Sequence, residues 1–177
     1  KALQNFMQVS RHYGEIKGFG PIEIVPSELR HANYLCVRLR DIDKKEIWLQ
    51  DADPLEVLHC PLLGNHKTYT ALCEGEPMCM FGTVNYDDSK ESLVWALGSD
   101  LVNKYKKSFH KASLQIIDML QADNEKIWNI VPYDHIETII WLKRLGFMIE
   151  NHKLILKNTP MLYFSRCKKE KSVATVH

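Results

Sequence analysis

The stretch KIWNIVPYDHIETIIWLKRLGF, residues 126–147, combines a strand, a helix and the start of a second strand in one short segment. Its apolar run at residues 127–131 predicts a strand that ends at Pro132, because proline cannot donate a hydrogen bond to a sheet. Isoleucine and leucine recur at helical spacing from Ile136 to Leu142, and Gly146 stands where a left-handed helix cap is expected. Residues 147–149 are apolar again. The stretch therefore predicts a strand–helix–strand unit that is capped at Gly146.

The rest of the chain alternates apolar segments with polar turns. This pattern predicts further strands at residues 22–25, 68–73, 78–84, 92–97, 153–156 and 161–164. Helices are expected to start near Ser27, at Asp41 or Asp43, and at Pro54, and one long helix is expected over residues 101–120. We predict an N-terminal segment at residues 1–21 with a short amphipathic helix, one α/β domain over residues 22–166, and a polar tail at residues 167–177.

Composition narrows the possible partners of the chain. The 177 residues are 45% hydrophobic and 25% charged, and 23 basic against 22 acidic side chains give a net charge of +1. Such a balance does not favour bulk binding to nucleic acid or to a membrane surface. We expect no membrane span, no signal peptide and no sequence-specific nucleic-acid binding. The five cysteines never occur as Cys-x-x-Cys, so no metal site is expected.

The unit at residues 126–147 resembles the C-terminal half of the GCN5-related N-acetyltransferase (GNAT) fold, in which a short helix beside the acyl-CoA pocket ends in a similar Leu-Gly-Phe. The segment LRDIDKKEIW, residues 39–48, resembles more closely a phage protein family with an acetyltransferase-like fold. That family includes the internal virion protein A of short-tailed phages. Further similar segments lie at residues 75–82, 95–99, 128–131 and 135–147. The resemblance implies a mixed, mostly antiparallel sheet with helices on both faces.

Active GNAT relatives bind the pyrophosphate of coenzyme A at the head of the long helix, through Arg/Gln-x-x-Gly-x-Gly/Ala. In this chain Lys106 takes the Arg/Gln place, and Phe109 and Lys111 take the glycine places. These bulky residues predict that coenzyme A does not bind with useful affinity, and that no cofactor is used. If a coenzyme A site persists, the resemblance assigns it to Leu97, Gly98, Ser99, Asn103 and Lys106.

The catalytic groups of the family are also absent from their expected places. Leu142 stands where relatives carry the tyrosine that protonates the leaving thiolate, and Tyr133 and Thr138 lie elsewhere. The only carboxylates near the expected place of the base are Glu76 and Glu91, both in sequence typical of exposed loops. The sequence therefore predicts a degenerate acetyltransferase with no catalytic residues.

The main functional prediction is a virion-associated internal core or assembly protein that acts through protein contacts. The resemblance implies portal or internal core proteins as partners, an assembly with multiple copies, and a location in the virion and, during assembly, in the host cytoplasm. We expect Arg40, Lys44, Lys45 and Trp48 to form an exposed interaction surface, and Trp95, Trp128 and Trp141 to be core. The alternative is an active GNAT N-acetyltransferase that uses acetyl-CoA on a protein or a small amine.

Overall fold

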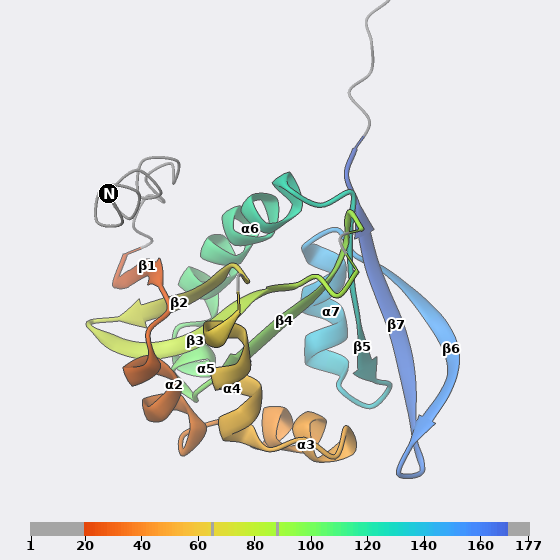
Figure 1. Ribbon diagram of the computed structural model, residues 1–177, viewed down its shortest axis with the longest axis horizontal. Helices are drawn as coiled ribbons and strands as arrows, with labels where there is room; N and C mark the ends of the chain where they lie inside the picture. The colour runs from red at the N-terminus through yellow and green to blue at the C-terminus, as the bar shows by residue number, and fades with distance from the viewer. Residues whose placement is uncertain (1–19, 65, 88, 170–177) are drawn as a thin grey trace, which may run out of the picture.

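A computed structural model of the protein describes residues 20–64, 66–87 and 89–169. Its seven strands form one sheet in the order β1-β2-β3-β4-β5-β7-β6, and only β4 and β5 pair in parallel (Figure 1). The strands are β1 Ile22–Pro26, β2 Thr68–Cys73, β3 Glu76–Val84, β4 Glu91–Gly98, β5 Lys126–Pro132, β6 Met148–Leu156 and β7 Thr159–Cys167. The helices are α2 Leu29–Cys36, α3 Asp41–Leu49, α4 Pro54–Leu63, α5 Leu101–Lys104, α6 Lys106–Ala122 and α7 Ile136–Arg144.

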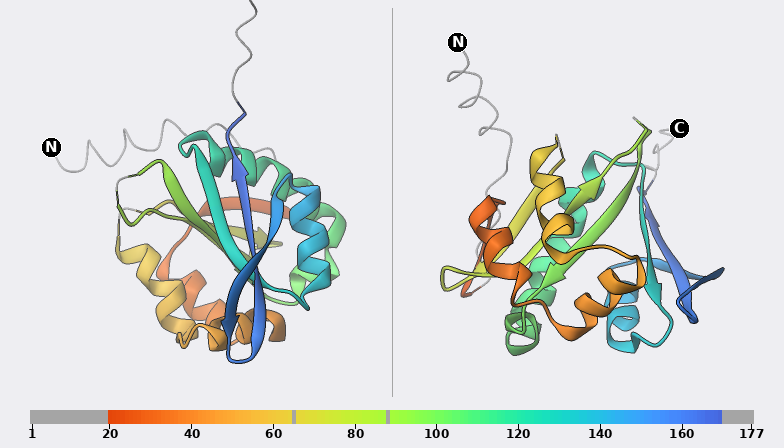
Figure 2. Two further views of the ribbon diagram at one scale, coloured as in Figure 1. Left: turned by 90° about the vertical axis from the view of Figure 1, so that its right-hand side faces the viewer. Right: turned by 60° about the horizontal axis from the view of Figure 1, so that its bottom comes forward.

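Helices cover both faces of this sheet, and the alternation of side chains along β3 shows why. Cys79 and Phe81 belong to the core cluster that contains α6 and α7, whereas Met80 belongs to the cluster that contains α2, α3 and α4. Successive residues of a strand point to opposite faces, so a strand buried on both sides reads as a continuous apolar run. Figure 2 shows α6 and α7 on one side of the sheet and α4 on the other. The predicted mixed, mostly antiparallel sheet is confirmed.

Local sequence signals are confirmed at two turns. Glu74 and Gly75 connect β2 to β3 and both have positive φ, 51° and 85°, as a tight hairpin requires. Gly146 has φ 87° just after α7, which is the left-handed conformation expected of a residue that ends a helix. The helix predicted to start at Pro54 is α4, and Asp53 caps it by accepting hydrogen bonds from the backbone N–H groups of Leu55 and Glu56.

Two sequence predictions about the elements were wrong, and a third is not tested. The helix predicted over residues 101–120 is two helices, because Tyr105 leaves helical geometry at φ −112°, ψ 34°. The apolar stripe continues across this break from Val102 to Phe109, so periodicity did not reveal it. The two strands predicted around residues 147–149 and 153–156 are the single strand β6, whose register shifts between Asn151 and Ile155. The helix predicted within residues 1–13 lies outside the described residues.

Candidate functional site

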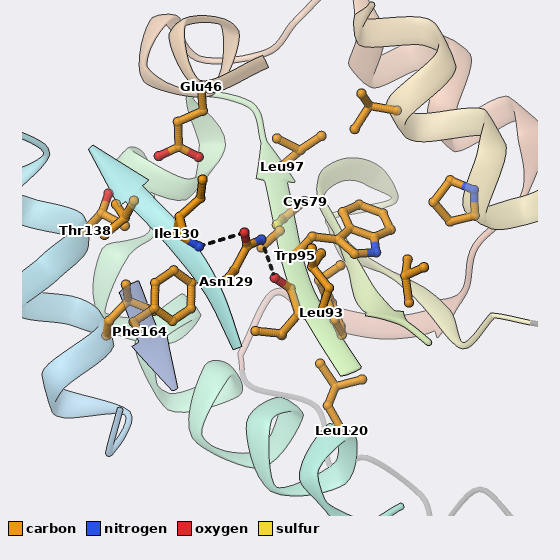
Figure 3. Close-up of a pocket in the computed structure, with 18 of the residues that line it drawn as sticks. Glu46, Cys79, Leu93, Trp95, Leu97, Leu120, Asn129, Ile130, Thr138 and Phe164 are labelled. Atoms are coloured by element: carbon orange, nitrogen blue, oxygen red, sulfur yellow. Dashed lines mark hydrogen bonds between the residues drawn. The ribbon is translucent and has the colours of Figure 1, made fainter. Parts of the chain in front are cut away.

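A fork between β4 and β5 opens the middle of the sheet. The two parallel strands pair only at their first three residues, from Glu91 with Lys126 to Leu93 with Trp128. Beyond that point the two strands separate: β5 remains paired with β7, and β4 remains paired with β3. The Asn129 side chain spans the start of the fork, where its amide donates to the Val94 carbonyl at 2.8 Å (Figure 3). The part of β4 beyond Val94 therefore has a strand neighbour on one side only.

A cavity of about 530 Å³ occupies the fork and reaches both faces of the sheet. Its wall below α6 and α7 is almost entirely apolar, and its wall below α3 and α4 carries polar and acidic groups. The apolar wall includes Phe109, Ile116, Ile117, Leu120, Trp141, Leu142 and Phe147, and the polar wall includes Glu46, Gln50, Glu56, Cys60 and His66. A pocket with mostly apolar lining and a few convergent polar groups is the usual form of a small-molecule site.

The polar wall is anchored by a buried ion pair at the start of α3, where Arg40 precedes the helix. The Arg40 guanidinium donates two hydrogen bonds to the Asp43 carboxylate, both at 2.9 Å, and the same carboxylate accepts the Gly98 backbone N–H at 2.9 Å. Asp43 is only 5% exposed, so its charge depends on these partners. The pair therefore fixes α3 to the end of β4, at the open end of the fork.

Glu46 lies one helical turn further along α3 and lines the cavity (Figure 3). Its Oε1 is 2.9 Å from Nδ1 of His135, the residue just before α7, and the His135 side chain is only 6% exposed. A carboxylate can only accept, so we assign the proton of this hydrogen bond to Nδ1. Burial raises the pKa of Glu46, and the negative charge of Asp43 adds to this rise, while His135 and Arg40 oppose it.

The head of α6 supplies backbone donors close to the fork. The Phe109 N–H donates to the Tyr105 carbonyl, so the N–H groups of residues 106–108 precede the first bond within the helix. Lys106 and Lys107 are exposed in this turn, and the Lys106 ammonium lies 3.1 Å from Glu137 of α7. Backbone donors and positive charge at a helix N-terminus are suited to a phosphate group.

This geometry corrects the steric argument from the sequence. Phe109 does not stand at the head of the helix: it is buried and stacks on Trp141 at a centroid distance of 6.0 Å. Lys111 is exposed two residues further along. Phe109 is the fourth residue of α6 and Lys111 the sixth, so neither belongs to residues 106–108, whose N–H groups precede the first bond within the helix. The predicted block of the pyrophosphate position is therefore absent.

The five conditional coenzyme A residues are only partly brought together. Leu97 lines the cavity, and Lys106 begins α6. The backbone N–H groups of Gly98 and Ser99 are already bonded, to Asp43 and to the Met78 carbonyl. Asn103 is exposed on the short helix α5. The Gly98 and Ser99 amides are thus engaged within the protein.

The residues weighed for proton transfer take different places in the structure. Leu142 is buried in the cavity wall, and Thr138, one turn earlier on α7, also lines the cavity. Tyr133, Glu76 and Glu91 are exposed, but the two carboxylates begin strands β3 and β4 and do not lie in loops as the sequence predicted. Sequence reasoning missed Glu46 and His135, which lie 89 residues apart. The similar segment at residues 39–48 was the available signal, because it contains Glu46.

The predicted interaction surface is divided by the structure. Arg40 is mostly buried with Asp43, which corrects its assignment to an exposed face. Lys44 is exposed beside Asp41, and Lys45 lies 2.7 Å from Asp134. Trp48 is 58% exposed, and the Lys157 ammonium lies over its ring at 4.1 Å from the centroid. Lys44, Lys45 and Trp48 thus remain accessible, and Arg40 does not.

The three tryptophans predicted to be core are all half-buried. Trp128 stacks on Tyr163 at a centroid distance of 5.7 Å. Trp95 and Trp141 pack against the two core clusters, but both also line the cavity. Their indole Nε1 atoms are buried and have no hydrogen-bond partner among the described residues. Two of these rings therefore combine a packing role with an accessible place in the site.

Solved structures with this architecture are GNAT-fold acetyltransferases. A ribosomal L7/L12 alpha-N-protein acetyltransferase in complex with coenzyme A has a TM-score of 0.62 and 12% identity, covering 86% of this chain and 97% of its own. Spermidine N-acetyltransferase from Vibrio cholerae, in complex with coenzyme A and spermine, has a TM-score of 0.64 and 9% identity, covering 84% of this chain and 96% of its own. Aminoglycoside acetyltransferase AAC(6')-Ib, in complex with coenzyme A, has a TM-score of 0.61 and 13% identity, covering 83% of this chain and 95% of its own.

The chain has the GNAT fold, with a mostly antiparallel sheet and helices on both faces. A scan against models of known families and a search of curated proteins found no match. The three structures above contain coenzyme A, and the steric ground for excluding it is gone, so the prediction that the protein uses no cofactor is wrong. Nothing in these comparisons indicates a phage protein.

No helix within residues 20–64, 66–87 and 89–169 is long and apolar enough to cross a membrane. Within the same ranges, no group of three or more His, Cys, Asp or Glu side chains is placed to hold a metal ion. Cys79 lines the cavity, and burial raises the pKa of its thiol to about 12, which disfavours a thiolate nucleophile there.

Proposed function

We propose that the protein is an N-acetyltransferase that binds acetyl-CoA in the fork between β4 and β5 and transfers the acetyl group to an amine. The observation that carries this proposal is the separation of the two strands after Leu93, which opens the cavity through the sheet. When bound, acetyl-CoA supplies a thioester carbonyl carbon for attack by the amine.

The residues of the fork fit the chemistry of this molecule. The pantetheine arm is an extended chain with two amide groups, which can pair with a strand that has one free edge. The buried indole N–H groups of Trp95 and Trp141 lack acceptors among the described residues, and amide carbonyls are suitable acceptors. The backbone N–H groups at residues 106–108, with Lys106 and Lys107, suit the pyrophosphate. These residues would hold the arm and the phosphates.

Calorimetric titration with coenzyme A and acetyl-CoA tests the proposal. We expect a micromolar dissociation constant, which corresponds to about −8 kcal/mol. Ala96 lines the cavity and is exposed, so Ala96→Phe should obstruct the fork and weaken binding at least about tenfold, or about 1.4 kcal/mol. Ala122→Phe, at the exposed end of α6, is the matched control and should bind as the unmodified protein does. A titration without measurable binding at millimolar ligand would rule the proposal out.

A second candidate is a virion component that keeps this fold. It is supported by the resemblance of residues 39–48 to the phage family and by the exposed Trp48 and Lys44 on α3. Its partners would be portal or internal core proteins, in multiple copies, in the virion and in the host cytoplasm during assembly. Mass spectrometry of purified phage particles tests this candidate. Absence of the chain from particles that contain the portal would exclude it.

A further inference from the structure

Three charged side chains follow one stripe of α3, and the acetyl-CoA site does not account for them. Arg40, Asp43 and Glu46 are spaced three residues apart and lie against the protein, whereas Asp41 and Lys44 are exposed. Buried charges are costly unless each has partners that replace water. Arg40 and Asp43 satisfy each other, and Asp43 also accepts the Gly98 N–H. Their role is thus explained by the attachment of α3 to β4.

Glu46 differs from these two residues because its partner lies on the other side of the fork. His135 precedes α7 and follows β5, whereas α3 is attached to β4. The hydrogen bond uses Oε1 of Glu46, and in the described part of the chain no hydrogen bond engages Oε2. The Glu46 side chain is 23% exposed and lines the cavity. A carboxylate held at one oxygen, with the other oxygen accessible from the cavity, is arranged to accept a proton.

We propose that Glu46 is the proton acceptor for the amine substrate, and that His135 is the residue that positions it. This inference rests on the proposed acetyltransferase function. A primary ammonium gives one proton to the Glu46 carboxylate, and the neutral amine forms a bond from its nitrogen to the thioester carbon. The carbon–sulfur bond breaks, the leaving thiolate takes the second proton of the nitrogen, and Glu46 returns its own proton to water. The products are an amide and free coenzyme A.

The electrostatic surroundings of Glu46 suit this role. Burial and the charge of Asp43 raise its pKa, so the carboxylate is a stronger base than an exposed one. The other charged groups around it are Arg40 on its own helix, His135, and Asp134, which lies 4.0 Å from His135 Nε2 and pairs with Lys45. Only the ionised form accepts a proton, so the rate should rise with pH as Glu46 ionises. Above that pH range the rate should level off.

The test measures coenzyme A release from acetyl-CoA, with methylamine at millimolar concentration as the acceptor, across the pH range. Glu46→Gln keeps the shape of the side chain and the acceptor for His135 but cannot take a proton. We expect it to bind acetyl-CoA as before, to turn over about 100-fold or more slowly, and to lose the acidic limb of the pH profile. Asp41→Asn, on the same helix and exposed, is the matched control and should behave as the unmodified protein does.

Two more variants separate proton transfer from a structural role. Glu46→Ala should recover activity when formate is added, because a small carboxylate can replace the missing base. His135→Ala removes a hydrogen bond that favours the ionised carboxyl, so it should move the acidic limb to higher pH. If Glu46→Gln binds and turns over normally with an unchanged pH profile, the inference fails while the acetyltransferase proposal stands. If the unmodified protein does not bind acetyl-CoA or does not acetylate methylamine, both fail.

Discussion

The two walls of the cavity are stabilised in opposite ways. The wall under α6 and α7 consists of apolar side chains such as Phe109, Ile116 and Trp141, whose stabilisation grows with the area they bury. The wall under α3 depends on one ion pair, Arg40 with Asp43, and on one hydrogen bond that His135 donates to Glu46. Packing is lost in proportion to the atoms removed, whereas a buried charge that loses its partner is left uncompensated. Substitutions should therefore have graded effects on one wall and abrupt effects on the other.

The largest expected effect is at Asp43 in the polar wall. Asp43→Ala leaves the Arg40 guanidinium and the Gly98 N–H without their partner, and it should lower the free energy of unfolding by about 3–5 kcal/mol. Asp41→Ala, two residues earlier and exposed, should change it by no more than about 0.5 kcal/mol. Urea denaturation of both variants measures the difference. Equal losses of unfolding free energy for the two variants would show that the buried ion pair does not stabilise the polar wall.

The apolar wall should respond strongly to loss of Trp141. Trp141→Ala removes the ring that stacks on Phe109 and should cost about 3 kcal/mol. Trp48→Ala removes an exposed ring that contacts Lys157 and should cost under about 1 kcal/mol. Thermal melts followed by circular dichroism compare the two variants. A melting temperature for Trp141→Ala close to that of Trp48→Ala would show that this ring contributes little to the wall.

A smaller effect should appear as a pH dependence at Glu46. A carboxyl group with a raised pKa binds its proton more tightly when folded, so its contribution to stability is greatest at acidic pH. That contribution is lost as the pH rises from the unfolded pKa through the folded pKa. The free energy of unfolding of Glu46→Gln should therefore increase relative to that of the unmodified protein as the pH rises. This increase should be smaller than the loss expected for Trp141→Ala. Urea midpoints at several pH values measure this difference, and a constant difference would contradict the raised pKa.

The smallest effect is expected outside both walls. Replacement of Lys44 and Lys45 together by Glu should change the free energy of unfolding by less than about 1 kcal/mol, because exposed ion pairs contribute little. Adding Arg40→Glu to this pair should destabilise the protein about as much as Asp43→Ala, since it breaks the same ion pair and places a negative charge against Asp43. Urea denaturation of the double and the triple variant makes the comparison. A stable triple variant would show that the polar wall is not essential.

Periodicity and turn chemistry predicted most of the elements from the sequence. The hairpin at Glu74 and Gly75 and the left-handed Gly146 after α7 depend on residues close together in the chain, and both were predicted. The break at Tyr105 was missed because the apolar stripe is continuous from Val102 to Phe109. Helical spacing alone does not distinguish one helix from two.

The site itself depends on contacts that local patterns do not encode. The fork exists because only three pairs join β4 to β5, and no local sequence pattern marks where parallel pairing stops. The hydrogen bond that His135 donates to Glu46 joins residues 89 positions apart. Among carboxylates near the predicted central strands the sequence contains only the exposed Glu76 and Glu91, whereas Glu46 lies on a helix. The spacing of Arg40, Asp43 and Glu46 by three was the detectable signal for a buried polar stripe.

The short parallel pairing between β4 and β5, which forms a seam between two strand sets, also has a consequence for folding kinetics. Strands β2, β3 and β4 form an antiparallel meander, and β5, β7 and β6 form a second antiparallel set. A parallel connection brings together residues far apart in the chain, so it forms more slowly than a hairpin. We therefore expect the two strand sets to form before the seam closes. Asn129→Ala, which removes the side-chain bond to Val94 at the seam, should speed unfolding more than it slows refolding.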